Sequence, residues 1–154
     1  MTQSRLLPPR DRLRQIGLVL ALLGALDAFY LTWIKLAHVQ ALCTSAGGCE
    51  TVNTSVYSEI HGVPIALFGL AAYLAMAALF ALEDRLPVLQ DYAPLGVFGL
   101  ALTGTLYSAY LTYVELFVLH AVCPYCVTSA LLITGIFTLS VVRLARGPLG
   151  AAVD

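Results

Sequence analysis

Charged residues are scarce in this chain. Asp, Glu, Lys and Arg together make up 11% of its 154 residues, whereas 60% of the residues are hydrophobic and the mean hydropathy is +0.87. A soluble domain usually carries about 25% charged residues. This chain has too few charges to cover a surface that faces water, so the composition excludes an ordinary soluble domain and indicates that the lipid bilayer is its solvent.

Motifs of several common protein classes are also missing. The sequence contains no phosphate-binding loop, no glycine-rich dinucleotide fingerprint and no basic cluster of the kind that binds nucleic acid. These absences argue against a nucleotide-dependent enzyme and against a nucleic-acid-binding protein.

Four apolar stretches are each long enough to cross a bilayer, which takes about 20 residues. They cover approximately 16–36, 64–82, 95–119 and 123–144. We therefore predict an all-α integral membrane protein, a four-transmembrane-helix bundle over residues 16–144. The remaining segments are a basic arm (1–15) that Pro8 and Pro9 keep from being helical, a long loop (37–63), a polar turn (83–94) and a tail (145–154).

Basic residues mark one side of this predicted bundle. Lysine and arginine are absent from loop 37–63, whereas arginines precede the first span, lie between the second and third, and end the fourth (Arg5, Arg10, Arg12, Arg14, Arg85, Arg143 and Arg146). Cytoplasmic segments collect positive charge. We therefore expect the cytoplasmic (inner) membrane, cytoplasmic termini and an extracytoplasmic loop. The alternative is a cleaved signal peptide at the N-terminus, but the first apolar run continues to Leu36.

Four cysteines fall into two pairs, Cys43 with Cys49 and Cys123 with Cys126. An internal repeat links the pairs, because residues 27–43 align without a gap on residues 107–123, with Tyr, Leu, Thr, Leu, Ala and Cys recurring at matching places. One thiol of each pair therefore sits at the same end of an equivalent helix. This arrangement predicts two dithiols that exchange electrons at one face of the membrane.

The run Cys123-Pro124-Tyr125-Cys126 opens the fourth span. Free N–H groups and the positive end of a helix favour a thiolate, which is the nucleophilic form of cysteine. A disulfide across so short a loop removes little entropy from the unfolded chain. A structural disulfide between Cys123 and Cys126 would therefore stabilise the fold only slightly. Structural disulfides and a four-thiolate zinc site remain as alternatives to redox chemistry, and we expect no metal.

The first pair lies in the outer loop, where Gly47 and Gly48 allow a tight bend between Cys43 and Cys49. The loop cysteines are placed to meet a soluble thiol partner and then Cys123, although a simple loop staple is the alternative. Farther along the loop, apolar residues four apart predict a short amphipathic helix over 52–60 on the membrane surface.

Several other side chains are candidates for a function. Asp27 lies inside the first span, where a carboxyl group either relays protons or bonds a hydroxyl of a neighbouring helix, and we favour the second role. Lys35 and Glu115 occupy equivalent repeat positions, so we expect a structural ion pair between them. Flat apolar walls for a quinone ring are offered by Phe68, Tyr110 and Tyr125.

With these residues in hand, the chain resembles a bacterial member of the vitamin K epoxide reductase family over about residues 16–144. The resemblance rests on the loop cysteines, on the segments 49–57 and 62–69, and on the Cys-Pro-Tyr-Cys run. It implies a four-helix bundle around a quinone. It further implies that Cys123 and Cys126 are the active centre, that Cys126 reduces the quinone, that Cys43 and Cys49 are the shuttle pair, and that Ser55 lies near the site.

The resemblance also implies the reaction. A thioredoxin- or DsbA-like protein passes electrons through the shuttle pair to a quinone (menaquinone, ubiquinone or phylloquinone), which supports disulfide-bond formation. Many bacterial members carry a fused thioredoxin-like domain after the last helix; because this chain ends at Asp154, we expect a separate partner. Two alternatives stay open, a non-enzymatic scaffold stapled by disulfides and a reductase acting mainly on vitamin K quinone or its epoxide.

Overall fold

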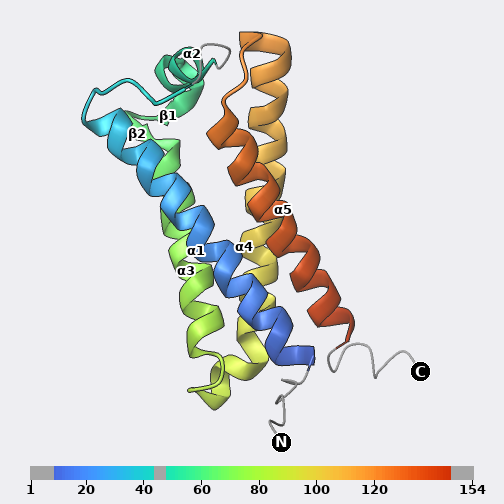
Figure 1. The fold of residues 1–154 in the computed structure, drawn as a ribbon. Helices are drawn as coiled ribbons and strands as arrows, with labels where there is room; N and C mark the ends of the chain where they lie inside the picture. The colour runs from blue at the N-terminus through green and yellow to red at the C-terminus, as the bar shows by residue number, and fades with distance from the viewer. Residues whose placement is uncertain (1–8, 44–47, 147–154) are drawn as a thin grey trace, which may run out of the picture.

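A bundle of four long helices makes up most of the protein (Figure 1). The computed structural model describes residues 9–43 and 48–146. Its long helices are α1 (Pro9–Leu36), α3 (Ile65–Leu82), α4 (Pro87–Tyr113) and α5 (Pro124–Ala145), and α4 continues as a π-helix, η2 (Val114–Leu119). All four are long and apolar enough to cross a membrane. The predicted four-helix membrane fold is confirmed.

The outer surface of the bundle is apolar. Large hydrophobic side chains on all four long helices are more than half exposed, among them Leu26, Leu74, Leu106 and Leu131. In a soluble protein such a continuous apolar surface would be a liability. Here it is the surface that faces the lipid chains.

Two helices begin earlier than the sequence predicts, and a proline explains each case. The expectation of a non-helical arm is wrong for residues 9–15, because α1 starts at Pro9. The predicted turn 83–94 is shorter, because α4 starts at Pro87 and contains Pro94. Proline lacks an N–H, but the first helical turn has no intrahelical acceptor for that group, so proline fits there. Residues 1–8 and 147–154 lie outside the described residues.

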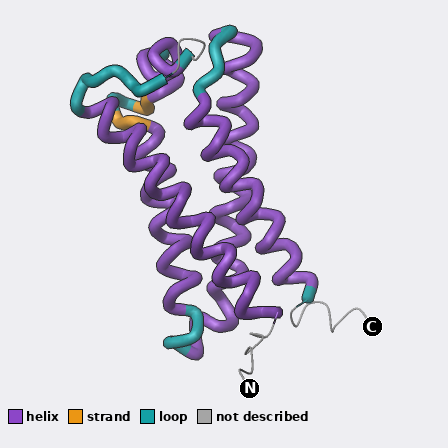
Figure 2. The backbone as a smooth tube through the Cα atoms, viewed as in Figure 1, coloured by secondary structure: helices purple, strands orange, loops and turns teal. Residues whose placement is uncertain are grey.

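The loop between α1 and α3 folds over one end of the bundle. It contains α2 (Cys49–Thr54), a 3₁₀ turn η1 (Val56–Ser58) and two short antiparallel strands, β1 (Glu59–Ile60) and β2 (Val63–Pro64). Figure 2 shows the strands in orange, close to the start of α3. The predicted amphipathic helix 52–60 is therefore displaced, because helix begins at Cys49 and ends where Ser55 adopts an extended conformation.

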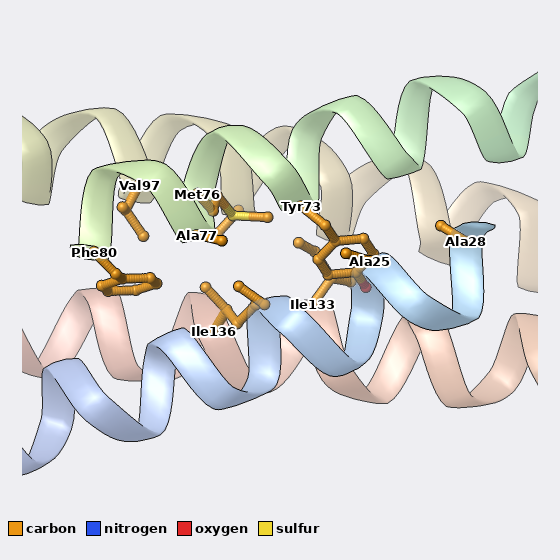
Figure 3. Close-up of a cluster of buried hydrophobic side chains, with 11 residues drawn as sticks. Ala25, Ala28, Tyr73, Met76, Ala77, Phe80, Val97, Ile133 and Ile136 are labelled. Carbon is orange, nitrogen blue, oxygen red and sulfur yellow. The ribbon is translucent and has the colours of Figure 1, made fainter. Parts of the chain in front are cut away.

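Small residues on α1 let the helices approach closely in the core (Figure 3). Ala21, Ala25 and Ala28 are buried against α3, where Tyr73 and Phe80 point inward. A side chain at Gly24 would collide with the ring of Tyr73. Membrane helices associate through such small-residue seams because lipid provides no hydrophobic force between them.

Ion pairs fasten the other end of the bundle. Arg143 of α5 donates hydrogen bonds of 2.7 Å to both carboxylate oxygens of Glu83, and its guanidinium lies 5.5 Å from the centre of the Phe80 ring. Arg14 of α1 pairs with Asp84. The start of α1, the α3–α4 turn and the end of α5 all lie at this end, opposite α2 (Figure 1).

We expect the substitution Arg143→Met to destabilise the fold by about 3–5 kcal/mol, because it leaves the Glu83 carboxylate buried without its partner. Both side chains are less than a tenth exposed. Unfolding in a detergent titration measures the change. The double variant Glu83→Gln with Arg143→Met removes both charges and should recover most of the stability. Equal losses in the single and double variants would contradict this account.

Candidate active site

The loop cysteines form a disulfide. Cys43 and Cys49 are bonded, with their Cα atoms 6.3 Å apart. Cys49 is the first residue of α2 and is buried, whereas Cys43 is partly exposed. The Gly48 N–H donates a 3.0 Å hydrogen bond to the backbone oxygen of Val122, which ties the start of α2 to the segment before α5. The disulfide therefore joins one partly exposed cysteine to one that is buried.

The second pair opens helix α5. Cys123 precedes the helix in an extended conformation, Pro124 is its first residue, and Cys126 lies in the first turn. Both are free thiols. A hydrogen bond from the Cys126 thiol and further bonds from the backbone at Cys126 and Tyr125 lower the pKa of the Cys123 thiol to about 7, although burial opposes the shift. Cys123 is therefore readily ionised near neutral pH.

The two pairs meet through one contact. The sulfur of Cys123 lies 3.7 Å from the sulfur of Cys49. Thiol–disulfide exchange proceeds by attack of a thiolate on a disulfide sulfur, so the reacting sulfurs must touch. Sequence reasoning left open which loop cysteine faces Cys123, and the structure places Cys49 there.

Gly48 is needed for close approach rather than for a bend. Its φ of −79° is accessible to any residue, so the backbone conformation at Gly48 does not require glycine. The bend predicted between the cysteines falls on residues 44–47, which lie outside the described residues. A Cβ atom at Gly48 would collide with the Cβ of Ala121. Because glycine has no side chain, the start of α2 packs directly on the loop segment that leads into Cys123.

Two tyrosines hold the backbone next to Cys43. The Leu42 N–H donates to the Tyr30 hydroxyl at 3.0 Å, and the Tyr125 hydroxyl donates to the Leu42 carbonyl at 3.0 Å. The two rings lie 5.0 Å apart. Tyr125, which sits between the cysteines of the Cys-Pro-Tyr-Cys run, thus connects that run to the disulfide loop.

A cavity of about 430 Å³ lies beside Cys126, between the helices and under the loop. Its walls are mainly apolar and include Phe68 of α3, and Ser55 lines it from the loop. The Tyr73 hydroxyl lies within 3.1 Å of the Ser129 hydroxyl on the same wall. Pockets of this size and character bind small organic molecules.

The predicted aromatic residues fall in different places. Phe68 lines the cavity together with Cys123 and Cys126. Among the described residues, the cavity lining includes neither Tyr110 nor Tyr125. Tyr110 is about half exposed on α4 and packs on Tyr107, a lining residue, with ring centres 6.1 Å apart.

The predicted ion pair between Lys35 and Glu115 is wrong. Lys35 instead binds the loop, donating to the Asn53 backbone oxygen and to the Ser58 hydroxyl and lying 3.8 Å from the Glu59 carboxylate. Glu115 points into the bundle, where it accepts the Cys123 N–H at 3.2 Å. Folding of the loop onto α1 supplies Lys35 with nearer partners.

Sequence reasoning named Glu115 only as an ion-pair partner and missed its position beside Cys123. The available signal was an acidic residue in an otherwise apolar run leading into the Cys-Pro-Tyr-Cys motif, the same signal that singled out Asp27. For Asp27 the predicted hydroxyl contact is not found at Oδ2, a buried oxygen without a hydrogen-bond partner among the described residues.

Comparisons with known proteins agree with this geometry. The chain matches the model of the vitamin K epoxide reductase family over residues 15–141. It is similar to the thiol-disulfide oxidoreductase LTO1 of Arabidopsis thaliana, with 34% identity over 122 residues, which is 75% of this chain and 32% of the relative. The chain thus spans about a third of the length of that relative. The chain belongs to the vitamin K epoxide reductase family.

Proposed function

We propose that this protein is a thiol:quinone oxidoreductase that reoxidises a thioredoxin- or DsbA-like partner and so supports disulfide-bond formation. The observation that carries the proposal is the order of the sulfurs. Cys43 is the accessible end of the shuttle disulfide, Cys49 contacts Cys123 at 3.7 Å, and Cys126 lines an apolar cavity. Electrons that enter at Cys43 therefore have a continuous route into the bundle.

Electrons enter by two exchange reactions. A partner thiolate attacks the Cys43 sulfur, the Cys43–Cys49 bond breaks, and Cys49 leaves as a thiolate. A second partner thiol then attacks the sulfur bound to Cys43, which releases the oxidised partner and leaves both shuttle thiols reduced. Two electrons have moved from the partner to the loop.

Electrons then pass to the active centre. The Cys49 thiolate attacks Cys123 in a Cys123–Cys126 disulfide, and Cys126 leaves as a thiolate. The Cys43 thiol attacks Cys49, which restores the shuttle disulfide and frees Cys123. The result is a reduced active centre beside the cavity, with its two electrons available to an acceptor.

A quinone is the acceptor that best fits this cavity. A quinone takes up two electrons and two protons, and its flat ring needs apolar walls. The cavity offers Phe68 as a wall and the Tyr73–Ser129 pair and Ser55 as hydrogen-bonding groups. The roles of Tyr110 and Tyr125 in quinone contact remain predictions, as does the identity of the quinone.

We place the protein in the cytoplasmic membrane with the cysteines outside. Arg14, Arg85, Arg143 and Arg146 lie at the end of the bundle opposite α2, and the loop 37–63 has no lysine or arginine. Positive charge favours the cytoplasmic side. A reductase acting mainly on vitamin K quinone or its epoxide would use the same thiols and cavity and is the second candidate.

The test is reduction of quinone by the purified protein, followed by ultraviolet absorbance, with a reduced Cys-x-x-Cys protein as the electron donor. We expect turnover that depends on both donor and quinone. The same assay with the quinone epoxide as acceptor distinguishes the second candidate, a reductase that acts mainly on vitamin K quinone or its epoxide. Absence of turnover with several donors and quinones, together with disulfides that resist a mild thiol buffer, would instead support the stapled scaffold.

A further inference from the structure

Glu115 is a buried carboxyl group in direct contact with the active centre. Its side chain is 4% exposed, and its Oε2 accepts the Cys123 N–H at 3.2 Å. Glu115 and Cys126 both line the cavity. The carboxyl thus contacts Cys123 and borders, together with Cys126, the cavity in which we place the electron acceptor.

The backbone holds Glu115 in an unusual conformation. Glu115 is the second residue of the π-helix η2, and its carbonyl accepts hydrogen bonds from the N–H groups of His120 and Ala121. His120 ends the helix with a φ of 50°, in the left-handed region. Short π-helical segments are rare and occur mostly at functional sites. This one brings an acidic side chain to Cys123 that a continued α-helix would place differently.

Among the described residues, Glu115 has no cationic partner that would explain it as half of a structural ion pair. It forms no ion pair in the part of the chain that the structure describes, because the cation at the equivalent repeat position, Lys35, is bound to the loop. An unpaired carboxyl buried among apolar walls is costly. Such groups are retained where they exchange a proton.

We propose that Glu115 is the catalytic proton carrier of this site, moving one proton from the active-centre thiols to the quinone oxygen. This inference rests on the proposed function. The carboxylate takes the proton of one thiol and becomes a carboxylic acid, which then gives that proton to the oxygen nearest it in the cavity.

Electrons and protons balance in this step. Formation of the Cys123–Cys126 bond from two thiols releases two electrons and two protons. The quinone takes up both electrons and both protons to become a quinol, with one proton arriving through Glu115 and the other from the remaining thiol or from water. Glu115 ends the step as the carboxylate with which it began.

The test compares Glu115→Gln with the wild type in two assays. Glutamine keeps an oxygen that can accept the Cys123 N–H but cannot carry a proton. We expect quinone reduction to fall by about 100-fold, within the usual range for loss of a general acid–base group. In the reduced protein without quinone, alkylation of the Cys123 and Cys126 thiols below pH 7 should become faster, because a negative neighbour disfavours the thiolate.

Slower quinone reduction together with faster alkylation distinguishes a proton carrier from a residue that only positions Cys123. A residue that only positions Cys123 would leave turnover within about twofold in Glu115→Gln, and that result would overturn the proposal, as would unchanged alkylation rates. Glu115→Asp keeps a titratable group and should turn over faster than Glu115→Gln; equal losses in the two would also overturn it. The exposed Glu50, next to Cys49, offers a matched control, and Glu50→Gln should leave both readouts unchanged.

The alkylation profile is recorded as a function of pH, so other titratable groups matter. Those that contact the thiols or line the cavity with Glu115 are the Cys49, Cys123 and Cys126 sulfurs and the phenols of Tyr57, Tyr73 and Tyr107. If the wild type reduces no quinone, the proposed function fails, whereas the alkylation rates still report whether Glu115 interacts electrostatically with the thiols. Correct folding of each variant is checked by formation of the Cys43–Cys49 disulfide.

Discussion

A variant carrying Cys43→Ser and Cys126→Ser should form a Cys49–Cys123 disulfide almost completely on mild oxidation. The two remaining sulfurs lie 3.7 Å apart in buried positions. A disulfide bond is about 2.05 Å long, so a small movement of the loop is enough to form it. Peptide mapping by mass spectrometry after alkylation of free thiols measures the yield.

The matched control exchanges the loop cysteines. A variant with Cys49→Ser and Cys126→Ser leaves Cys43 and Cys123, and the hydrogen bonds of Leu42 to Tyr30 and Tyr125 hold the backbone beside Cys43 in place. We expect little cross-linking in this variant under the same conditions. A Cys43–Cys123 bond that forms as readily as the Cys49–Cys123 bond would show that the relay does not depend on the contact in the structure.

Gly48→Ala should slow transfer from the shuttle pair to the active centre by about 100-fold, the effect expected for a misplacement of about 1 Å. The added methyl group would overlap Ala121, so α2 must move away from the chain that leads into Cys123. The Gly48 hydrogen bond to Val122 would lengthen with it. Stopped-flow mixing of the donor-reduced protein with quinone measures the transfer rate.

Gly99→Ala is the control for this substitution, because a Cβ atom at Gly99 meets no atom within 4 Å. We expect wild-type rates. Reduction of the Cys43–Cys49 bond by the donor should also remain normal in Gly48→Ala, since Cys43 stays accessible. Wild-type transfer in Gly48→Ala would mean that the approach of α2 to Ala121 is unimportant for the relay.

The fold was predictable because its cause is local in the sequence. Length and apolarity alone decide that a segment crosses a membrane, and all four predicted spans are helices in the structure. The ends were less predictable. The sequence predicts that Pro9 prevents a helix and that residue 87 lies in a turn. In the structure Pro9 and Pro87 each begin a helix, because a proline in the first turn costs no hydrogen bond.

The redox chemistry of the site was predictable too, since the spacing of the cysteines and the start of a helix at Pro124 are visible in the sequence. The contacts between the two cysteine pairs were not predictable. The approach of Cys49 to Cys123 depends on how α2 packs on Ala121, across 74 positions of sequence. The pair of Glu115 with Lys35 was predicted from their equivalent positions in the repeat, but the second repeat passes into a π-helix and the first does not.

The most direct test of the central claim is the yield of quinol from the reduced protein in the absence of donor and oxygen. Four cysteines make two dithiols, so the wild type should form two quinols per chain. A variant with Cys43→Ala and Cys49→Ala should form one, and Cys126→Ala should form none. Quinol formation by Cys126→Ala, or none by the wild type, would contradict a relay through the shuttle pair to Cys126 and the cavity.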